Sequence, residues 1–320
     1  MIWKKRGLLF DLKGKDNQQP FQEFAQSPQT IVFDDFIRVY FSTRTRDVTN
    51  TYLSKIAYVD YDLEFKNVLN VSSEEIISLG ELGTYDQHGI FPIHPFKDGD
   101  TIYAFLTGWN RRVSVPVETS IGIAKSMDNG LTFQRLGNGP VLSSSLNEPH
   151  LVGDGFVLKV NDVFYMFYIF GVQWHKATKN EPVARVYKIG LATSTDLVNW
   201  KKNDGKQIIA SFLNENECQA LPTVVEFDGM YHMVFCYREA TDFRTNPTRG
   251  YRLGYAYSND LIHWERNDKK LGLPLDLEGN DWDSKMMCYP HLVKVKNKVF
   301  LLYNGNEFGK FGFGLAELII

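Results

Sequence analysis

A short pattern recurs five times along the chain and restricts the folds that it can adopt. In each copy a proline or glycine opens an apolar run, a tight polar turn follows, and an aromatic residue lies thirteen positions after the opener. The opener and its aromatic are Pro28 and Phe41, Pro92 and Phe105, Gly155 and Tyr168, Pro222 and Phe235, and Pro290 and Tyr303. Successive openers are 64, 63, 67 and 68 residues apart. A period of this length predicts an array of equivalent supersecondary units.

Each copy also has a second half, which begins with small and apolar residues such as Gly122-Ile123-Ala124. In the first four copies an aromatic follows eight or nine positions after the alanine, at Phe65, Phe133, Trp200 and Trp264. The fifth copy, at Gly314-Leu315-Ala316, ends before such an aromatic is reached. The N-terminal run around Trp3 resembles the run around Trp200, so we expect the N-terminus to complete the fifth copy.

These halves predict four β-strands in each copy. Asp98-Gly99 and Asp228-Gly229 are typical of hairpin turns, and proline is tolerated as the first residue of a strand. A ring of four-stranded blades buries faces that a lone sheet would expose. Closing the last blade with the first strand also removes free sheet edges. We therefore expect an all-β chain that forms one five-bladed β-propeller domain over residues 1–320, with the N-terminal strand closing the last blade.

Composition excludes several classes of partner. The formal net charge is −3, which gives no general attraction to nucleic acid, and no run reaches the ~18 apolar residues of a membrane span. The start of the chain lacks the apolar core of a signal peptide. Cys218, Cys236 and Cys288 show no CxxC spacing, and we interpret them as reduced, buried residues. Together these features favour a cytoplasmic protein.

The predicted topology separates the loops onto two faces. The openers, the segments leading into them and the loops between second and third strands share one face. Those loops are long, at about 44–53, 109–119, 172–185 and 238–252, as is typical of binding loops on a rigid scaffold. They hold or adjoin nine of the 13 arginines. Because guanidinium groups bind carboxylate or phosphate through two bonds, we expect an anionic ligand, with pairing to loop acids as the alternative. The arginines that we assign to substrate binding are Arg44, Arg111, Arg112, Arg238 and Arg252.

Acidic residues lead into the first strands on the same face. Cleavage of a glycosidic bond uses two carboxyl groups, one protonated and one ionised. We expect Asp154, Glu217 and Glu148 to be catalytic, with Asp154 best placed because it directly precedes an opener. The alternatives are a turn-forming Asp154 and solvated loop acids at the other two positions. Asp86 and Asp283 are expected to bind substrate.

Aromatic and histidine side chains join these acids. We expect Trp109, Trp174, Tyr289 and His150 to contact a sugar, although strand aromatics also serve in packing. The histidines lack the local spacing of a metal motif, so no metal or cofactor is predicted. A structural cation in the central channel would leave no sequence signature.

The blade pattern, the count of five and the acids before the first strands resemble the five-bladed propeller glycosidases. These include arabinanases, xylosidases, invertases, levansucrases and mannoside phosphorylases. The segment 287–316 is similar to uncharacterised glycosidase-like proteins of surface-polysaccharide gene clusters. The arabinanase-type pattern implies acids directly before the first and third openers and two residues before the fourth. Only Asp154 matches, since Ser27 and Ala220 occupy the other two positions. Glu217, three residues before Ala220, lies in a Glu-Cys pair like that of invertases.

Three functions are consistent with this resemblance. The first is a glycoside hydrolase that acts on a charged or phosphorylated glycan in a central funnel. The second is a glycoside phosphorylase, whose chemistry needs only one protein acid. The third is a non-catalytic or biosynthetic sugar-binding protein of surface-polysaccharide assembly. All three imply a carbohydrate or sugar-phosphate ligand, without nucleic acid and without a membrane span.

Overall fold

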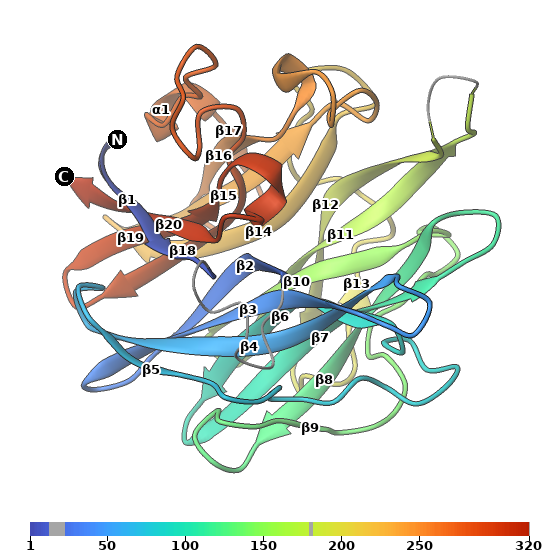
Figure 1. Ribbon diagram of the computed structural model, residues 1–320, viewed down its shortest axis with the longest axis horizontal. Coiled ribbons are helices and arrows are strands. Elements are labelled where there is room, and N and C mark those ends of the chain that lie inside the picture. Colours follow the sequence, from blue (N-terminus) through green and yellow to red (C-terminus); the bar gives the residue numbers. More distant parts are fainter. Residues whose placement is uncertain (13–22, 179–181, 320) are drawn as a thin grey trace.

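The computed structural model describes residues 1–12, 23–178 and 182–319. Strands dominate this part of the chain, which confirms the all-β prediction (Figure 1). Its only helical turns, within the described residues, are η1 (Pro247–Arg249), α1 (Asp268–Leu271) and η2 (Asn306–Gly309). None of the described helices is both long and apolar enough to cross a membrane.

The strands follow the four-strand period of the sequence. The first strands are β2 (Glu23–Val32), β6 (Gly89–Asp98), β10 (Val152–Val160), β14 (Cys218–Phe227) and β18 (Cys288–Val295). The second strands are β3 (Phe36–Arg46), β7 (Thr101–Arg111), β11 (Val163–His175), β15 (Met230–Arg238) and β19 (Lys298–Asn304). The third strands are β4 (Tyr52–Asp62), β8 (Val117–Ser126), β12 (Ala184–Ser194), β16 (Arg252–Ser258) and β20 (Phe313–Ile319). The fourth strands are β5 (Val68–Val71), β9 (Gln134–Arg135), β13 (Lys201–Lys202), β17 (Glu265–Arg266) and β1 (Ile2–Phe10).

Hydrogen bonding groups these strands into four sheets. Three are four-stranded, with the orders β10-β11-β12-β13, β14-β15-β16-β17 and β1-β20-β19-β18. The fourth has eight strands, because two antiparallel units are joined through a single parallel pair, Ser54 with Gly89. Trp3 of β1 lies opposite Leu318 of β20, so the N-terminal strand completes the last sheet as predicted.

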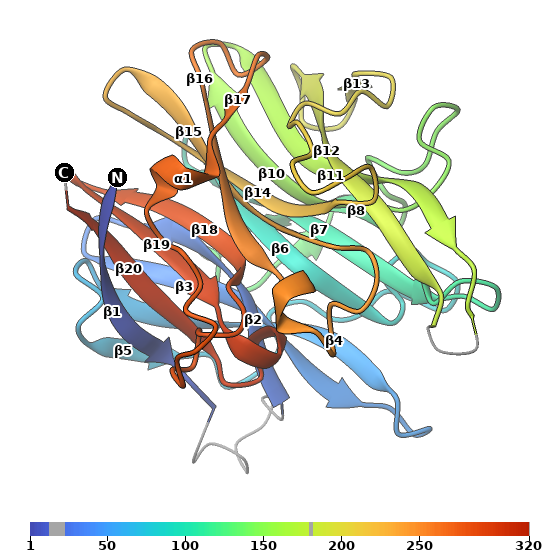
Figure 2. The same ribbon diagram turned by 90° about the horizontal axis from the view of Figure 1, so that it is seen from above.

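The first strands of the units lie side by side around a common centre (Figure 2). They contact one another in the cyclic order β2, β6, β10, β14 and β18, and β18 contacts β2 in turn. No single sheet closes on itself in the described residues; the first strands of the cycle contact one another without strand pairing between them. This arrangement brings the same end of every first strand to one place.

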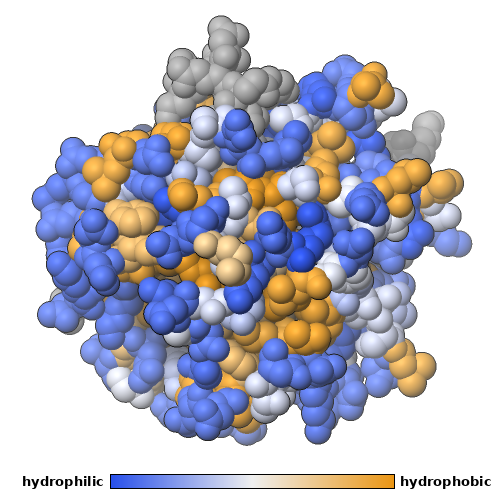
Figure 3. All heavy atoms as spheres, turned by 90° about the horizontal axis from the view of Figure 1, so that it is seen from below, coloured by the Kyte–Doolittle hydropathy of each residue, from blue (hydrophilic) through white to orange (hydrophobic). Residues whose placement is uncertain are grey.

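The aromatics of the thirteen-residue spacing form the core between the sheets. All five lie on second strands and are at most 1% exposed. The aromatics of the second half pack against neighbouring units: Trp200 lies edge-on to Phe105 and Trp264 to Phe167. Cys218, Cys236 and Cys288 are free thiols buried in the same core. The face shown in Figure 3 is mostly hydrophilic, with hydrophobic patches between the polar residues.

The glycine of the repeat makes room for an aromatic ring, which gives a first prediction. A Cβ atom at Gly314 would lie 2.2 Å from Cζ2 of Trp282 and 2.6 Å from the backbone oxygen of Gly7. The backbone of β1 cannot yield without disturbing its pairing with β20. We expect Gly314→Ala to lower the free energy of unfolding by about 1–3 kcal/mol, measured by urea denaturation. Gly137→Ala, where nothing lies within 4 Å of the added atom, is the control. Equal stability of the two variants would contradict this account.

Candidate functional site

A β-bulge recurs at the start of every first strand. The strand register shifts between Gln26 and Gln29, Ile90 and Ile93, Gly153 and Phe156, Ala220 and Thr223, and Cys288 and His291. A bulge interrupts the in-and-out alternation of side chains and redirects one of them. The redirected position directly precedes the opener, at Ser27, Phe91, Asp154, Leu221 and Tyr289.

Four of these five residues have a left-handed backbone conformation, which is unfavourable for any residue other than glycine. Their φ angles are 57° at Ser27, 55° at Asp154, 49° at Leu221 and 53° at Tyr289. Such a conformation costs about 1–3 kcal/mol per residue and persists only where surrounding structure enforces it. Strained residues of this kind concentrate at functional sites, and here they gather around the centre of the molecule.

A cavity of about 80 Å³ lies where these positions converge. Phe91, Asp154 and Tyr289 enter it from three different first strands. The third strands and their approaches contribute Thr119, Arg185, Tyr187 and Tyr251. The remaining lining residues are Thr107, Leu151, Gly153, Ile169 and Ala220. We call this space the central cavity. Asp154 is its only carboxyl group within the part of the chain that the structure describes.

Asp154 is buried, and its environment favours the neutral acid. Burial raises the pKa of this carboxyl to about 7, although the Leu221 N–H and the charge of Arg185 act in the opposite direction. The backbone N–H of Leu221 donates to Oδ2 over 3.2 Å. The N–H of Asp154 itself donates to Oγ1 of Thr107 over 2.8 Å, which fixes the strained backbone. The site thus holds a carboxyl group that can release or take a proton near neutral pH.

Arginine supplies the opposite charge at this cavity. The Arg185 guanidinium lines it and forms no hydrogen bond or ion pair with any described residue. Arg238 lies behind the wall and donates to the hydroxyl of Tyr187 over 2.9 Å. That hydroxyl lies 2.5 Å from the hydroxyl of Tyr251. Arg185 is therefore available to an anion, whereas Arg238 positions the two tyrosines.

The four other acids predicted for the site share a different arrangement. Each is buried in the segment that leads into a first strand and is paired with a base from the fourth strand of the same unit. The pairs are Asp86 with Arg135, Glu148 with Lys202, Glu217 with Arg266 and Asp283 with Lys5. In all four the base lies two positions after the aromatic of the second half of the repeat. None of these acids lines the central cavity.

Further hydrogen bonds occupy these carboxylates. The Tyr168 hydroxyl donates to Glu148 over 2.6 Å, and the Tyr303 hydroxyl donates to Asp283 over 2.8 Å. Glu217 accepts the backbone N–H groups of Phe212 and Leu213, both over 2.9 Å, besides Arg266. Carboxylates held in this way tie the entries of β6, β10, β14 and β18 to their own sheets.

The remaining predicted arginines lie outside the central cavity. Arg44 donates to Gln26 over 2.9 Å and stacks near Phe24 and Tyr52, and burial lowers its pKa. Arg111 is paired with Asp47, and Arg112 with Glu118. Arg252 lines a separate cavity. The alternative of pairing with loop acids therefore describes Arg111 and Arg112.

Of the predicted sugar-contacting residues, only Tyr289 lines the central cavity. Its ring lies edge-on to Phe91 and Tyr251, with centroids 5.2 and 5.8 Å apart. Trp109 stacks on His88, and Trp174 packs against the apolar core. His150 is half-buried beside Gly171. Across residues 1–12, 23–178 and 182–319, no cluster of three His, Cys, Asp or Glu side chains is arranged to hold a metal ion.

Sequence reasoning overlooked residues that recur at a fixed place in the repeat. Thr119, Tyr187 and Tyr251 each lie three positions before the glycine of a third strand, at Gly122, Gly190 and Gly254. This offset is visible in the sequence. Its meaning depends on knowing that third strands begin beside the central cavity. Arg185 lies within the arginine cluster, but nothing in the sequence separates it from arginines that are paired.

Comparison with known proteins gives a clear relative along the full length. The uncharacterised protein Rv1502 of Mycobacterium tuberculosis is 32% identical over 319 residues, which cover 99% of each chain. The chain belongs to the Rv1502 family. No protein-family model matches it. A 1,2-beta-oligomannan phosphorylase of Thermoanaerobacter is 28% identical over 153 residues, covering 45% of this chain and 47% of that enzyme.

This Rv1502 family member also has a fold similar to those of more distant proteins with solved structures. A glycoside hydrolase superposes with a TM-score of 0.72 at 15% identity, covering 99% of this chain and 92% of the other. An endo-arabinase of Bacteroides thetaiotaomicron gives a TM-score of 0.59 at 14% identity, covering 93% and 95%. The chain thus has the fold of the propeller-type glycoside hydrolases, which confirms the resemblance inferred from sequence.

Proposed function

We propose that the chain is a single five-bladed propeller domain over residues 1–320 and that its central cavity cleaves a glycosidic bond. The cyclic contacts of the five first strands support five blades, with each four-strand unit as one blade. The most direct reaction is hydrolysis of a charged or phosphorylated glycan. Three buried free thiols are consistent with our further expectation of a cytoplasmic location.

The observation that carries this proposal is the state of Asp154. A glycosidase needs a carboxylic acid that stays protonated near neutral pH to protonate the leaving oxygen. Burial gives Asp154 that property, with a pKa of about 7. The bulge before Gly155 holds it at the convergence of the first strands, where a sugar ring would meet it. We assign Asp154 as the acid and give Glu148 and Glu217 a structural role.

The other walls of the cavity suit a sugar that carries an anionic group. The Thr119 hydroxyl is buried without a hydrogen-bonding partner among the described residues and would bind a hydroxyl of a saccharide. Phe91 and Tyr289 present ring surfaces for its apolar face. Arg185, whose guanidinium has no hydrogen-bonding partner among the described residues, would hold carboxylate or phosphate.

One observation favours phosphorolysis as a second candidate. Asp154 is the sole carboxyl among the described residues of the cavity, whereas hydrolysis normally uses two. In a phosphorylase, inorganic phosphate replaces water as the nucleophile and needs no protein base. Arg185 then binds the phosphate. The partial identity with an oligomannan phosphorylase supports the same alternative.

A single assay separates the candidates. The protein is incubated with β-1,2-linked mannotriose and with acidic oligosaccharides, with or without inorganic phosphate. Reducing sugar released in phosphate-free buffer supports hydrolysis. Sugar 1-phosphate formed only with phosphate supports phosphorolysis. Saturable binding of these sugars without turnover under either condition would overturn both and favour a sugar-binding protein.

Arg185 provides a further prediction. We expect Arg185→Gln to raise the KM for phosphate or for the anionic substrate at least about tenfold, because a charge-assisted hydrogen bond is lost. The effect on kcat should be smaller. Arg112→Gln, which removes an exposed arginine paired with Glu118, is the matched control. Unchanged KM in Arg185→Gln would show that the anion lies elsewhere.

A further inference from the structure

A second and larger cavity shares no lining residue with the central one. Its volume is about 610 Å³, within the range of small-molecule sites. The start of β16 divides the two cavities: Tyr251 lines the central cavity, whereas the next residue, Arg252, lines the second. We call the second space the β16 groove.

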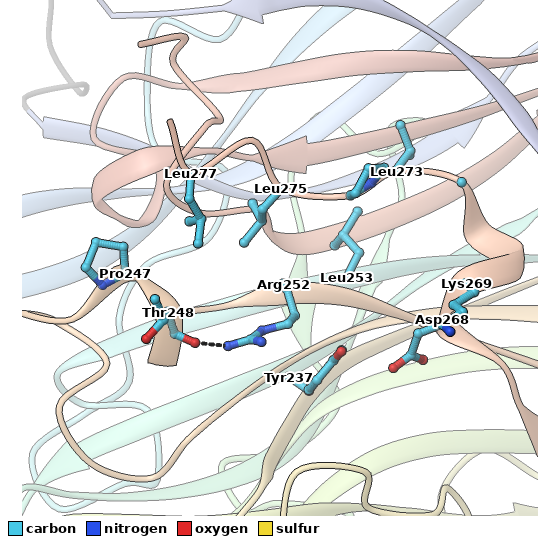
Figure 4. A pocket seen from close by; sticks show the side chains of 12 residues that line it. Tyr237, Pro247, Thr248, Arg252, Leu253, Asp268, Lys269, Leu273, Leu275 and Leu277 are labelled. Atoms are coloured by element: carbon cyan, nitrogen blue, oxygen red, sulfur yellow. Dashed lines mark hydrogen bonds between the residues drawn. The ribbon is translucent and has the colours of Figure 1, made fainter. Parts of the chain in front are cut away.

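Leucines form the wall that faces Arg252 (Figure 4). Leu273, Leu275 and Leu277 alternate along the segment after α1 and all line the groove. Leu253 and Pro247 extend this apolar surface from β16 and η1. The groove is therefore a poor match for a sugar, whose hydroxyls need many polar partners, and a good match for an apolar body.

Arg252 brings an uncompensated charge into this apolar setting. Its Nη2 donates to the backbone oxygens of Thr248 and Gly250. Its Nε is buried and has no acceptor. No carboxylate of the described residues forms an ion pair with it, unlike Arg111 or Arg266. Nη1 makes no hydrogen bond with a described residue and remains as a donor that an incoming anion would satisfy.

The one acid of the groove does not supply that anion. Asp268 accepts three hydrogen bonds from Arg266: Nε donates to Oδ1 over 3.0 Å and to Oδ2 over 3.2 Å, and Nη2 donates to Oδ2 over 2.8 Å. Arg266 is in turn paired with Glu217. Asp268 is thus held by a different arginine, which it shares with Glu217, and it forms no ion pair with Arg252. Lys269 also lines the groove and adds to the positive potential.

We propose that the β16 groove binds a small amphipathic anion, with its carboxylate, sulfonate or phosphate on Arg252 and its apolar body against the leucines. This assignment is independent of the reaction in the central cavity. It rests on a guanidinium without an ion pair among the described residues and an apolar wall that line the same groove.

The test uses the dye 8-anilinonaphthalene-1-sulfonate, which combines an aromatic body with a sulfonate. We expect saturable binding with a rise in fluorescence. Arg252→Gln should weaken that binding by about tenfold or more, because charge-assisted hydrogen bonds are lost. Leu277→Asp should weaken it as well, and it should leave folding intact because Leu277 is 36% exposed. Arg112→Gln should bind the dye as the wild type does.

A neutral dye makes the test specific for the anion. N-phenyl-1-naphthylamine has the same apolar body without the sulfonate. Its affinity should fall in Leu277→Asp and stay unchanged in Arg252→Gln. If Arg252→Gln weakens both dyes equally, Arg252 only shapes the groove and the anion assignment is overturned. If none of the variants changes the affinity of either dye, the dyes bind elsewhere and the proposal as a whole is overturned.

Discussion

Replacement of Asp154 by asparagine is expected to remove turnover while making the protein more stable. General acid catalysis by a positioned side chain contributes about 10²–10⁴-fold to the rate, and the amide cannot donate the required proton. Activity of the wild type should also fall as pH rises through about 7, where Asp154 loses its proton. Both effects are measured as kcat on the substrate identified by the oligosaccharide assay.

The gain in stability follows from the direction of the pKa shift. The carboxyl has a pKa of about 7 in the folded chain, against an ordinary value of 3.8. Between these values the folded chain keeps a proton that the unfolded chain releases, so the free energy of unfolding falls as pH rises and levels off above 7. The amide of the variant is uncharged at every pH and escapes this loss. The variant should exceed the wild type by at most about 4 kcal/mol at pH 8 and converge with it near pH 4.

The control for this experiment is another acid on the same face. Asp242 is exposed, and its carboxylate lies 3.7 Å from Arg249. Asp242→Asn should change neither kcat nor the pH dependence of urea denaturation. Full activity in Asp154→Asn would show that Asp154 is not the general acid. Equal stability of Asp154→Asn and the wild type at pH 8 would show that burial does not hold the carboxyl in its neutral form.

Replacement of Glu217 by glutamine should instead destabilise the protein without removing the chemistry. Glu217 is fully buried and pairs with Arg266, whose side chain is 1% exposed. Breaking such a pair typically costs about 3–5 kcal/mol because a buried charge loses its partner. Arg266 retains Asp268, so we expect a loss near the lower end of this range, measured by urea denaturation.

Activity then separates a structural from a catalytic Glu217. The folded fraction of Glu217→Gln should keep a kcat within a few-fold of the wild type, since Glu217 does not line the central cavity. Lys294→Gln, which removes an exposed charge on β18, is a control with little effect on stability. If Glu217→Gln keeps the free energy of unfolding of the wild type but loses turnover, Glu217 is a catalytic residue and not a structural one.

The strands could be predicted from the sequence because all five copies of the repeat have the same order of opener, turn and aromatic residue. Five agreeing copies outweigh an ambiguous segment in one of them, and the likeness of Trp3 to Trp200 was enough to place the N-terminal strand. The same logic made Asp154 the best-placed candidate, since the position before the opener converges at the centre. Four other acids were candidates as well because the topology places them on the same face.

Their pairing was harder to predict. A base such as Lys202 is more than fifty residues from Glu148 in sequence, and only the folded unit brings them together. All five acids are buried, so burial alone does not separate Asp154 from the others. The four others each form an ion pair with a base, whereas Asp154 forms none with any described residue. This difference depends on side-chain contacts, which cannot be predicted from the spacing of residues in the sequence.

The pairing of β1 with β20 has a consequence for how the chain is made. Ile2 lies opposite Ile319, so β1 leaves the ribosome long before the strand that it pairs with. At about 5–20 residues per second, synthesis of the intervening chain takes about 15–60 s. During that time β1 has no sheet to join, and its backbone groups are open to other chains. The last sheet can therefore be completed only after β20 has emerged.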